Sequence, residues 1–281
     1  MAYKILLTEQ VSDLAVQLAS DFEVLTFSLP ALGRDRPLQD AKSLSAYFER
    51  YNPSLVINTL SGATDLIGIE LLGELCQQHN TPLLHVSSVD VFDPGLEGAA
   101  ALENDSPTAS HSRGLALIAA EHTVAQVPRH IILRLPYLTS ATHGSWLDQL
   151  CRALLHADQL CVSESHRLDP ISLQEASRVI VALSQQILCG AENWGILHLH
   201  SADTCSEAEL ADHLVRFFKK SQLATALLDP IKGPSNWLPP RGVLGGQRVT
   251  DQFGVQLRSW RNGLRSQVEL CLEQQRQGEL F

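Results

Sequence analysis

The sequence predicts an α/β protein with a Rossmann-like, doubly wound parallel sheet and a smaller C-terminal lobe. Short apolar runs rich in β-formers alternate with longer helical periods through the first half of the chain, and strands separated by amphipathic helices imply βαβ units. This rhythm loosens after Arg134. A chain of 281 residues can form one large domain or two smaller lobes.

The first half supplies the expected sheet. Strands are predicted at residues 4–8, 23–27, 55–58, 83–87 and 130–134, with helices at 11–20, 38–51, 67–79 and 114–124. Pro82 and Pro128 follow two of these helices and precede strands, as proline after a helix C-terminus does. We therefore expect residues 1–135 to form the Rossmann-like domain, completed by parts of 165–200.

The second half is expected to form the smaller lobe, from residues 136–164 and 201–281. Helices are predicted at 146–155, 173–187, 206–219 and 260–275, and a strand at 195–200. Ser206 and Glu209 have the spacing of a capping box, which supports the start of the third helix. Residues 229–246 hold four prolines and four glycines and are expected to form an ordered loop.

Composition excludes several classes of protein. The net charge of −10 argues against nucleic-acid binding, which needs a basic face. The apolar runs are too short to span a bilayer and no signal peptide opens the chain, so we expect a cytoplasmic protein without a membrane partner. The six cysteines show no CxxC pair. His198 and His200 could share a strand face, but further ligands are not evident, and no metal site is expected.

The turn after the first strand does not suit a dinucleotide. In dinucleotide-binding folds this turn is rich in glycine, because the backbone must bend tightly and approach the pyrophosphate. The first glycine of this chain is Gly33. In this chain the turn has side chains that would take up the room a phosphate needs, and two of them are acidic. Its residues are Glu9, Gln10, Val11, Ser12 and Asp13.

Several segments, in order along the chain, carry a family resemblance. They are residues 54–59 (SLVINT), 85–93 (HVSSVDVFD), 114–121, 132–137 (ILRLPY), 171–181, 195–214 and the closing segment 239–264, which ends in W-x-x-x-L. Together they resemble the extended short-chain dehydrogenase/reductase superfamily, in particular its dTDP-4-dehydrorhamnose reductase, sugar-nucleotide-binding branch. The resemblance implies an NAD(P)-binding domain and a smaller substrate-type lobe.

The residues at the family's catalytic positions differ. The resemblance implies a Tyr that donates a proton, a Lys four residues later that lowers the pKa of this Tyr, and a Ser or Thr that orients the carbonyl. With Glu121 on the family's Glu, the Tyr position holds Arg113 and the Lys position holds Leu117. Residues 52–136 contain no tyrosine and 43–218 no lysine, so no local shift restores the pair. Only Ser88 is retained.

The candidate cleft residues lie at the carboxyl ends of the predicted strands, where open α/β folds bind ligands. Arg113 is a candidate to bind an anion, or else to pair with Asp90 or Asp105; Arg134 is expected in a structural ion pair, and His85 as a satisfied core histidine. Asn58, Thr59 and Ser61 could line a pocket or form a polar loop. The full candidate set is Asn58, Thr59, Ser61, Ser87, Ser88, Asp90, Arg113, Arg134, Pro136 and Tyr137.

These departures predict a catalytically degenerate family member, a binding or regulatory scaffold without a cofactor. A regulatory subunit that resembles the same branch works by contacting a partner enzyme. One alternative is a divergent nucleotide-sugar reductase or epimerase that binds NADP; Arg113 could not serve as its acid, because guanidinium does not deprotonate in proteins. The other alternative is a sugar-nucleotide sensor. A partner protein or a small anionic ligand is expected, and the resemblance makes a homodimer plausible.

Overall fold

Five short apolar strands form one parallel sheet, in the order β1-β2-β3-β5-β10. The computed structural model describes residues 3–9, 12–24, 40–59, 66–93, 99–233, 235 and 242–278. The strands are β1 (Ile5–Leu7), β2 (Leu55–Asn58), β3 (Leu83–Ser88), β5 (His130–Leu135) and β10 (Gly195–His198). They agree with the predicted Rossmann-like α/β class.

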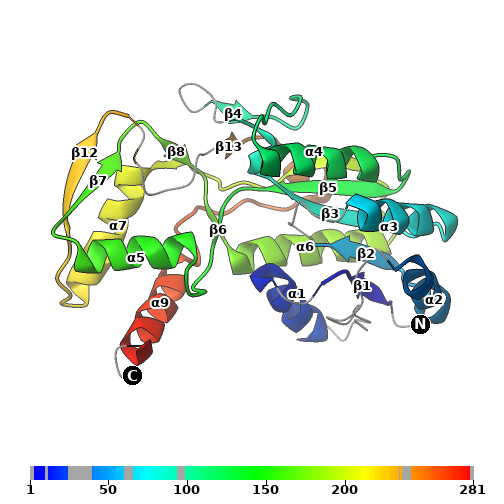
Figure 1. Ribbon diagram of the computed structural model, residues 1–281, viewed down its shortest axis with the longest axis horizontal. Helices are drawn as coiled ribbons and strands as arrows, with labels where there is room; N and C mark the ends of the chain where they lie inside the picture. The colour runs from blue at the N-terminus through cyan, green and yellow to red at the C-terminus, as the bar shows by residue number, and fades with distance from the viewer. Residues whose placement is uncertain are drawn as a thin grey trace.

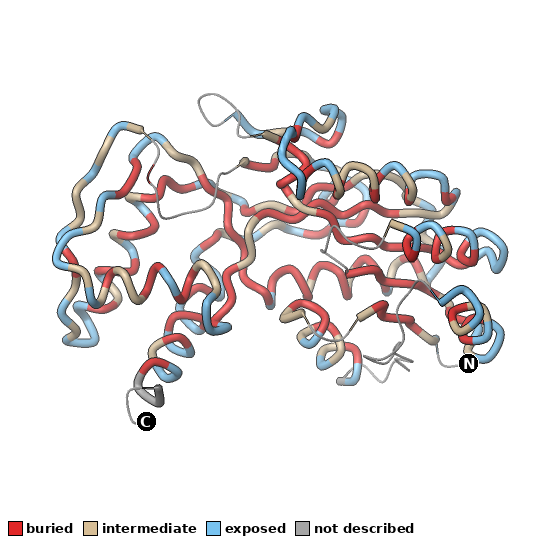
Figure 2. Tube along the Cα trace, viewed as in Figure 1, coloured by how far each residue is buried: buried red, intermediate tan, exposed pale blue. Residues whose placement is uncertain are grey.

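Helices cover both faces of the sheet (Figure 1). Because successive side chains of a strand point to opposite faces, Ile5 and Leu7 pack with one layer of helices and Leu6 with the other. The first layer contains α1 (Asp13–Val24), α6 (Leu173–Leu188) and α8 (Arg248–Phe253). The second contains α2 (Ala41–Tyr51), α3 (Leu66–Gln78) and α4 (Ser112–Val124). Most residues of the sheet between them are buried (Figure 2).

A second lobe has its own apolar core beside the sheet (Figure 1). Its helices are α5 (Trp146–His156), α7 (Glu207–Lys220) and α9 (Leu264–Gly278). Two small sheets complete it: β7 (Gln159–Ser163) runs parallel to β12 (Leu227–Ile231), and β8 (Arg167–Leu168) antiparallel to β11 (Cys205–Ser206). The predicted capping box is confirmed, since Ser206 caps α7 and Glu209 bonds back to its amide.

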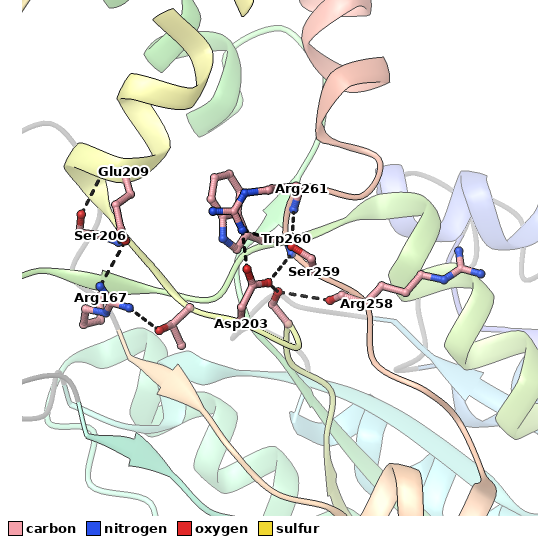
Figure 3. Close-up of polar contacts among 10 residues, drawn as sticks. Arg167, Asp203, Ser206, Glu209, Arg258, Ser259, Trp260 and Arg261 are labelled. Carbon is pink, nitrogen blue, oxygen red and sulfur yellow. Dashed lines mark hydrogen bonds and ion pairs between the residues drawn. The ribbon is translucent and has the colours of Figure 1, made fainter. Parts of the chain in front are cut away.

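Short paired segments join the two lobes. β4 (Ala100–Ala101) pairs with β13 (Val243–Leu244), β6 (Leu138–Thr139) pairs with β9 (Ile171–Ser172), and the one-turn helix η1 (Val89–Val91) follows β3. Figure 3 shows how the segment before α9 is held. Asp203 accepts the Trp260 amide at 3.3 Å and the Arg261 guanidinium at 2.5 Å (Figure 3). The Arg258 carbonyl accepts the Ala202 amide at 2.9 Å.

Some sequence expectations were wrong. Residues 23 and 24 end α1 rather than opening a strand, and 25–27 lie outside the described residues. The expected loop 229–246 contains the end of β12 and all of β13, because partners distant in sequence, β7 and β4, complete their hydrogen bonding. The last helix begins at Leu264, after a turn at 260–263. Helix α8, which packs on the larger core, was not predicted.

None of the helices in the described part of the chain is long and apolar enough to cross a membrane.

A fully buried ion pair lies under the carboxyl edge of the sheet. Arg134 of β5 bonds Glu121 of α4 through both carboxylate oxygens, at 3.0 and 2.7 Å, and both side chains are at most 4% exposed. Ser87 of β3 donates to the same carboxylate at 2.6 Å. This confirms the expected structural pairing of Arg134. A bidentate geometry of this kind fixes both position and orientation, so it locks β3, α4 and β5 together.

The network continues into the closing segment. A guanidinium can only donate, so His198 of β10 accepts from Arg134 through Nε2 at 3.2 Å. Its Nδ1–H then donates to the carbonyls of Ala101 and Gly245, at 3.1 and 2.9 Å. The Arg134 guanidinium carbon also lies 5.0 Å from the centre of the Phe92 ring. One arginine thereby connects the sheet to the paired strands β4 and β13.

Substituting Arg134 tests this network. In Arg134→Met the Glu121 carboxylate stays buried without its cation, and breaking a buried pair in this way costs roughly 3–5 kcal/mol. The double variant Glu121→Leu/Arg134→Met removes both charges and should recover at least half of that loss. Urea unfolding at neutral pH measures both values. A single variant as stable as the wild-type chain would show that the pair does not hold the fold.

Candidate functional site

A cavity of about 330 Å³ opens at the carboxyl edge of the sheet, between β3, β5, the start of α1 and the start of α5. Open α/β folds bind their ligands at this edge. The cavity brings together the predicted residues Thr59, Ser87, Ser88, Arg113, Pro136 and Tyr137. Hydroxyl groups, one guanidinium and the Asp13 carboxylate supply most of its polar lining.

Three predicted cleft residues do not line the cavity. Arg134 is 1% exposed and committed to Glu121, and Asp90 lies behind Arg113 and Tyr137. Asn58 is fully buried: it accepts from Thr8 at 2.8 Å and contacts His85 Nδ1 at 2.9 Å. The sequence could not separate these from true cleft residues, because a polar side chain at a strand end serves either purpose. Ser61 lies outside the described residues.

The N-terminus of α1 makes contacts within the protein through Ser12 and Asp13. Ser12 caps it by accepting the Ala15 amide at 3.3 Å. The carboxylate of Asp13, the first residue of α1, accepts hydroxyls from Ser140 at 2.6 Å and Thr142 at 2.5 Å. Ser140 and Thr142 follow β6 in the connection to α5. The acidic turn therefore ties the sheet domain to the second lobe; Gln10 and Val11 of the expected turn are not described.

This arrangement places a negative charge where a dinucleotide fold receives one from its ligand. A helix N-terminus with free amides is an anion site, because its backbone donors and dipole both favour negative charge. Here Asp13 supplies the anion, and a phosphate beside it would meet like charge. Ser140 and Thr142 were missed by the sequence analysis: they are about 130 residues from Asp13, and no local pattern marks the contact.

Arg113 faces the cavity from the first turn of α4. His111 caps this helix by accepting the Gly114 amide at 3.1 Å. A Cβ on Gly114 would lie 2.5 Å from the Asp90 carbonyl, so only glycine permits this close approach of α4 to η1. The approach sets the Arg113 guanidinium 2.8 Å from the Asp90 carboxylate, with 56% of the arginine side chain still exposed.

Tyr137 enters the cavity from the opposite wall, after β5, and its hydroxyl donates to the other oxygen of Asp90. The phenolic proton is thus directed at a carboxylate and away from the cavity. Ser88 also lines the cavity, and its hydroxyl accepts the Asp90 amide at 3.2 Å. A serine without a base beside it is not an activated nucleophile. These groups can bind and orient an anion, but they offer it no free acid.

Leu117, one turn after Arg113, is 3% exposed and belongs to an apolar cluster with Val89, Phe92 and Leu244. An amine in that environment would lose its hydration without gaining a partner. The position is thus part of the packing between α4, η1 and β13. Its side chain cannot assist proton transfer in the cavity.

A chain of buried polar side chains crosses the sheet below the first turn, from Thr8 through Asn58 to His85. Burial lowers the pKa of His85 to about 4, against the opposing charge of Glu121, so the imidazole is neutral at pH 7. His85 was expected to be a satisfied core histidine, and this is only half confirmed. Its Nε2 is buried and has no hydrogen-bond partner.

The two histidines of the HxH pair bond mainly backbone. His198 is committed to Arg134 and to two carbonyls, and His200 contacts the carbonyls of Ser201 and Gly246 at 2.8 and 2.9 Å. Burial first, and then the charge of Arg134, lower the pKa of His198 to about 4. Within the described ranges, no three His, Cys, Asp or Glu side chains are grouped to hold a metal ion.

A parallel sheet with a cleft at its carboxyl edge and a second lobe across that cleft defines the Rossmann-like class of extended short-chain dehydrogenases/reductases. The family model described as RmlD substrate binding domain matches residues 3–272. The chain therefore belongs to this family, of which dTDP-4-dehydrorhamnose reductases are members.

Similar proteins agree with this assignment over nearly the whole chain. A dTDP-4-dehydrorhamnose reductase of Burkholderia thailandensis is 21% identical, covering 96% of this chain and 98% of that protein. A solved dTDP-4-dehydrorhamnose reductase of Clostridium acetobutylicum superposes with a TM-score of 0.79 at 18% identity, covering 96% and 99%. One of Bacillus anthracis, solved in complex with NADP, gives 0.76 at 14% identity, covering 98% and 100%. At these identities the structures show a shared fold.

The contact between Asp13 and the second lobe is open to test by a double-mutant cycle. Asp13→Ala and Ser140→Ala should each lower the free energy of unfolding, by roughly 1–2 kcal/mol, since the bond involves a charged acceptor near the surface. The double variant should lose less than the sum, with a coupling of about 0.5–1.5 kcal/mol. Strictly additive losses in urea unfolding would mean that the two groups do not interact.

Stability should fall as the pH drops below about 6.5, because the unfolded chain then protonates histidines that the folded chain holds neutral. A pKa of about 4 for His85 against 6.5 unfolded predicts a loss of roughly 1–2 kcal/mol between pH 7 and pH 5. His85→Gln should reduce that pH dependence even if the variant is less stable overall. The exposed His122→Gln is the control, and an equal slope in both variants would refute the assignment.

Proposed function

We propose that this chain is a non-catalytic member of its reductase family, a binding or regulatory protein whose cleft takes a small anionic ligand. It neither binds a dinucleotide at the first turn nor transfers a hydride. The ligand lies on the substrate side of the cleft, between Ser88, Arg113 and Tyr137.

The observation that carries the proposal is the Asp13 carboxylate at the N-terminus of α1. It already accepts hydroxyls from Ser140 and Thr142, at 2.6 and 2.5 Å. A pyrophosphate in the usual place would have to displace these bonds and would also face the carboxylate itself. At about 4 Å and an effective dielectric of about 20, two like unit charges repel by roughly 4 kcal/mol. Dinucleotide binding is disfavoured on both counts.

The proton-transfer positions support the same conclusion independently. By the family resemblance, Arg113 stands at the tyrosine position and Leu117 at the lysine position, and Leu117 is packed in an apolar cluster. Tyr137 is the tyrosine that lines the cavity, but its hydroxyl donates to Asp90. A divergent NADP-dependent reductase, the competing proposal, would need an acid that this arrangement does not present.

The cavity retains features that suit an anionic, hydroxyl-rich ligand. Arg113 is only partly neutralised by Asp90, and more than half of its side chain is exposed. Its remaining N–H groups can bind phosphate or carboxylate oxygens in a fork. Ser87 and Ser88 add hydroxyls, and Trp146 adds an aromatic wall whose indole N–H is held by the Leu138 carbonyl at 2.7 Å. Nucleoside diphosphates and their sugar conjugates have this combination of groups.

A thermal-unfolding series tests the proposal. The midpoint should rise by several degrees with UDP or dTDP at about 100 times the dissociation constant, which adds about 2.7 kcal/mol, and it should not change with NADPH or NADH. Arg113→Leu should weaken nucleotide binding at least about tenfold by removing the cation. Arg50→Leu, an exposed arginine on α2, is the matched control. Saturable NADPH binding with turnover of a keto-sugar nucleotide would overturn the proposal.

A further inference from the structure

A groove of about 560 Å³ lies on the second lobe, between the end of α7 and the start of α9, away from the cleft. It is lined by His213, Arg216, Phe217, Lys220, Ser221 and Arg265. Three permanent cations therefore line one depression on a chain whose net charge is −10. The lining of the groove is therefore basic, whereas the protein as a whole is acidic.

One of the cations of the groove stands at a helix position where the helix dipole disfavours positive charge. Lys219 and Lys220 end α7, where positive charges interact favourably with the negative end of the helix dipole. Arg265, however, stands in the first turn of α9, which has no acidic residue and where a cation is unfavourable. Its partner Glu269 lies four residues later at 2.9 Å, in the weaker order of charges along a helix. The stability of α9 alone does not explain this arginine.

Among the described residues, the three cations of the groove outnumber the two carboxylates that pair with them. Arg216 pairs with Asp212 at 2.7 Å, yet 75% of the arginine side chain is exposed, and 78% of Arg265 is exposed beside Glu269. Burial lowers the pKa of His213, and the positive charges of Arg261, Arg216 and Lys220 lower it further, although Asp212 opposes this. A positive potential therefore remains at the groove after its own carboxylates are counted.

The lining also contains an aromatic ring. The Phe217 ring is half-buried in the groove, and the Arg265 guanidinium carbon lies 5.9 Å from its centre. Next to it Arg261 stacks over Trp260 at 4.1 Å, while its guanidinium also bonds Asp203 (Figure 3). Stacking of this kind holds arginines in place and reduces the entropy that a partner must overcome.

We propose that the α7–α9 groove is a docking surface for a short acidic segment of a partner protein. The carboxylates of this segment bind Arg216, Lys220 and Arg265, and an apolar side chain of the segment packs on Phe217. This site is separate from the cleft, so it stands whether or not the cleft binds a nucleotide.

The charge and the size of the groove favour a short acidic peptide segment over other anions. A long polyanion such as nucleic acid would extend over the acidic remainder of the surface and be repelled there, whereas a short acidic segment meets only the basic groove. A free phosphate would gain little from the polar side chains of the groove, because His213, Arg216, Lys220, Ser221 and Arg265 are all exposed. An aromatic ring beside several cations matches an acidic segment that contains an apolar residue.

The test uses the full chain and a fluorescein-labelled peptide of glutamates around one phenylalanine, followed by fluorescence anisotropy at low salt. The groove variant Lys220→Glu/Arg265→Glu should weaken peptide binding by at least about tenfold. The control Lys42→Glu/Arg50→Glu carries the same net charge but places it on α2, at the far end of the molecule (Figure 1). It should bind within about twofold of the wild-type chain. A matched peptide with glutamine for glutamate should not bind.

Thermal unfolding of both variants shows that each is folded before binding is compared. Phe217→Ala should weaken binding of the phenylalanine peptide more than that of its alanine counterpart. An equal loss in the groove and control variants would overturn the proposal, since net charge alone would then explain the binding. It would also be overturned if inorganic pyrophosphate or a single-stranded oligonucleotide bound the groove more tightly than the peptide, or if the wild-type chain did not bind the peptide.

Discussion

The buried pair of Arg134 and Glu121 determines the geometry of everything around the cleft. A bidentate pair with almost no solvent exposure must keep its partners, and together with Ser87 and His198 it connects β3, α4, β5 and β10. Through His198 the same arginine also fixes the carbonyls of Ala101 and Gly245. The wall of the cleft and the closing segment are therefore set by one guanidinium.

Within that framework, the proposed loss of the family's reaction rests on contacts internal to the protein. In dinucleotide enzymes an anion of the ligand sits at the first helix of the fold. In this chain Asp13 supplies the anion and bonds the second lobe directly. On the other side of the cleft, Asp90 holds both Arg113 and Tyr137. We propose that these two carboxylates take the places of the ligand phosphate and of the catalytic network.

Most of the sheet was predicted because its information was local: short apolar runs, helical periods and the capping box at Ser206 agree with the structure. The exception is the strand expected at residues 23–27, of which 23 and 24 end α1. Prediction failed where structure depends on distant partners. β12 and β13 form because β7 and β4 pair with them. At the site, the departures at Glu9–Asp13, Arg113 and Leu117 were visible in the sequence. The hydroxyls of Ser140 and Thr142 that hold Asp13 were not, and neither was the burial of Asn58.

The proposal that Asp13 takes the place of a ligand phosphate at the N-terminus of α1 is tested most directly by one crystal structure. Crystals grown with NADPH and dTDP, both in excess, would show which ligand the cleft accepts. We expect dTDP beside Ser88 and Arg113, with the bonds from Ser140 and Thr142 to Asp13 unbroken. A dinucleotide with its pyrophosphate at the N-terminus of α1, and Asp13 turned away from Ser140 and Thr142, would contradict the account.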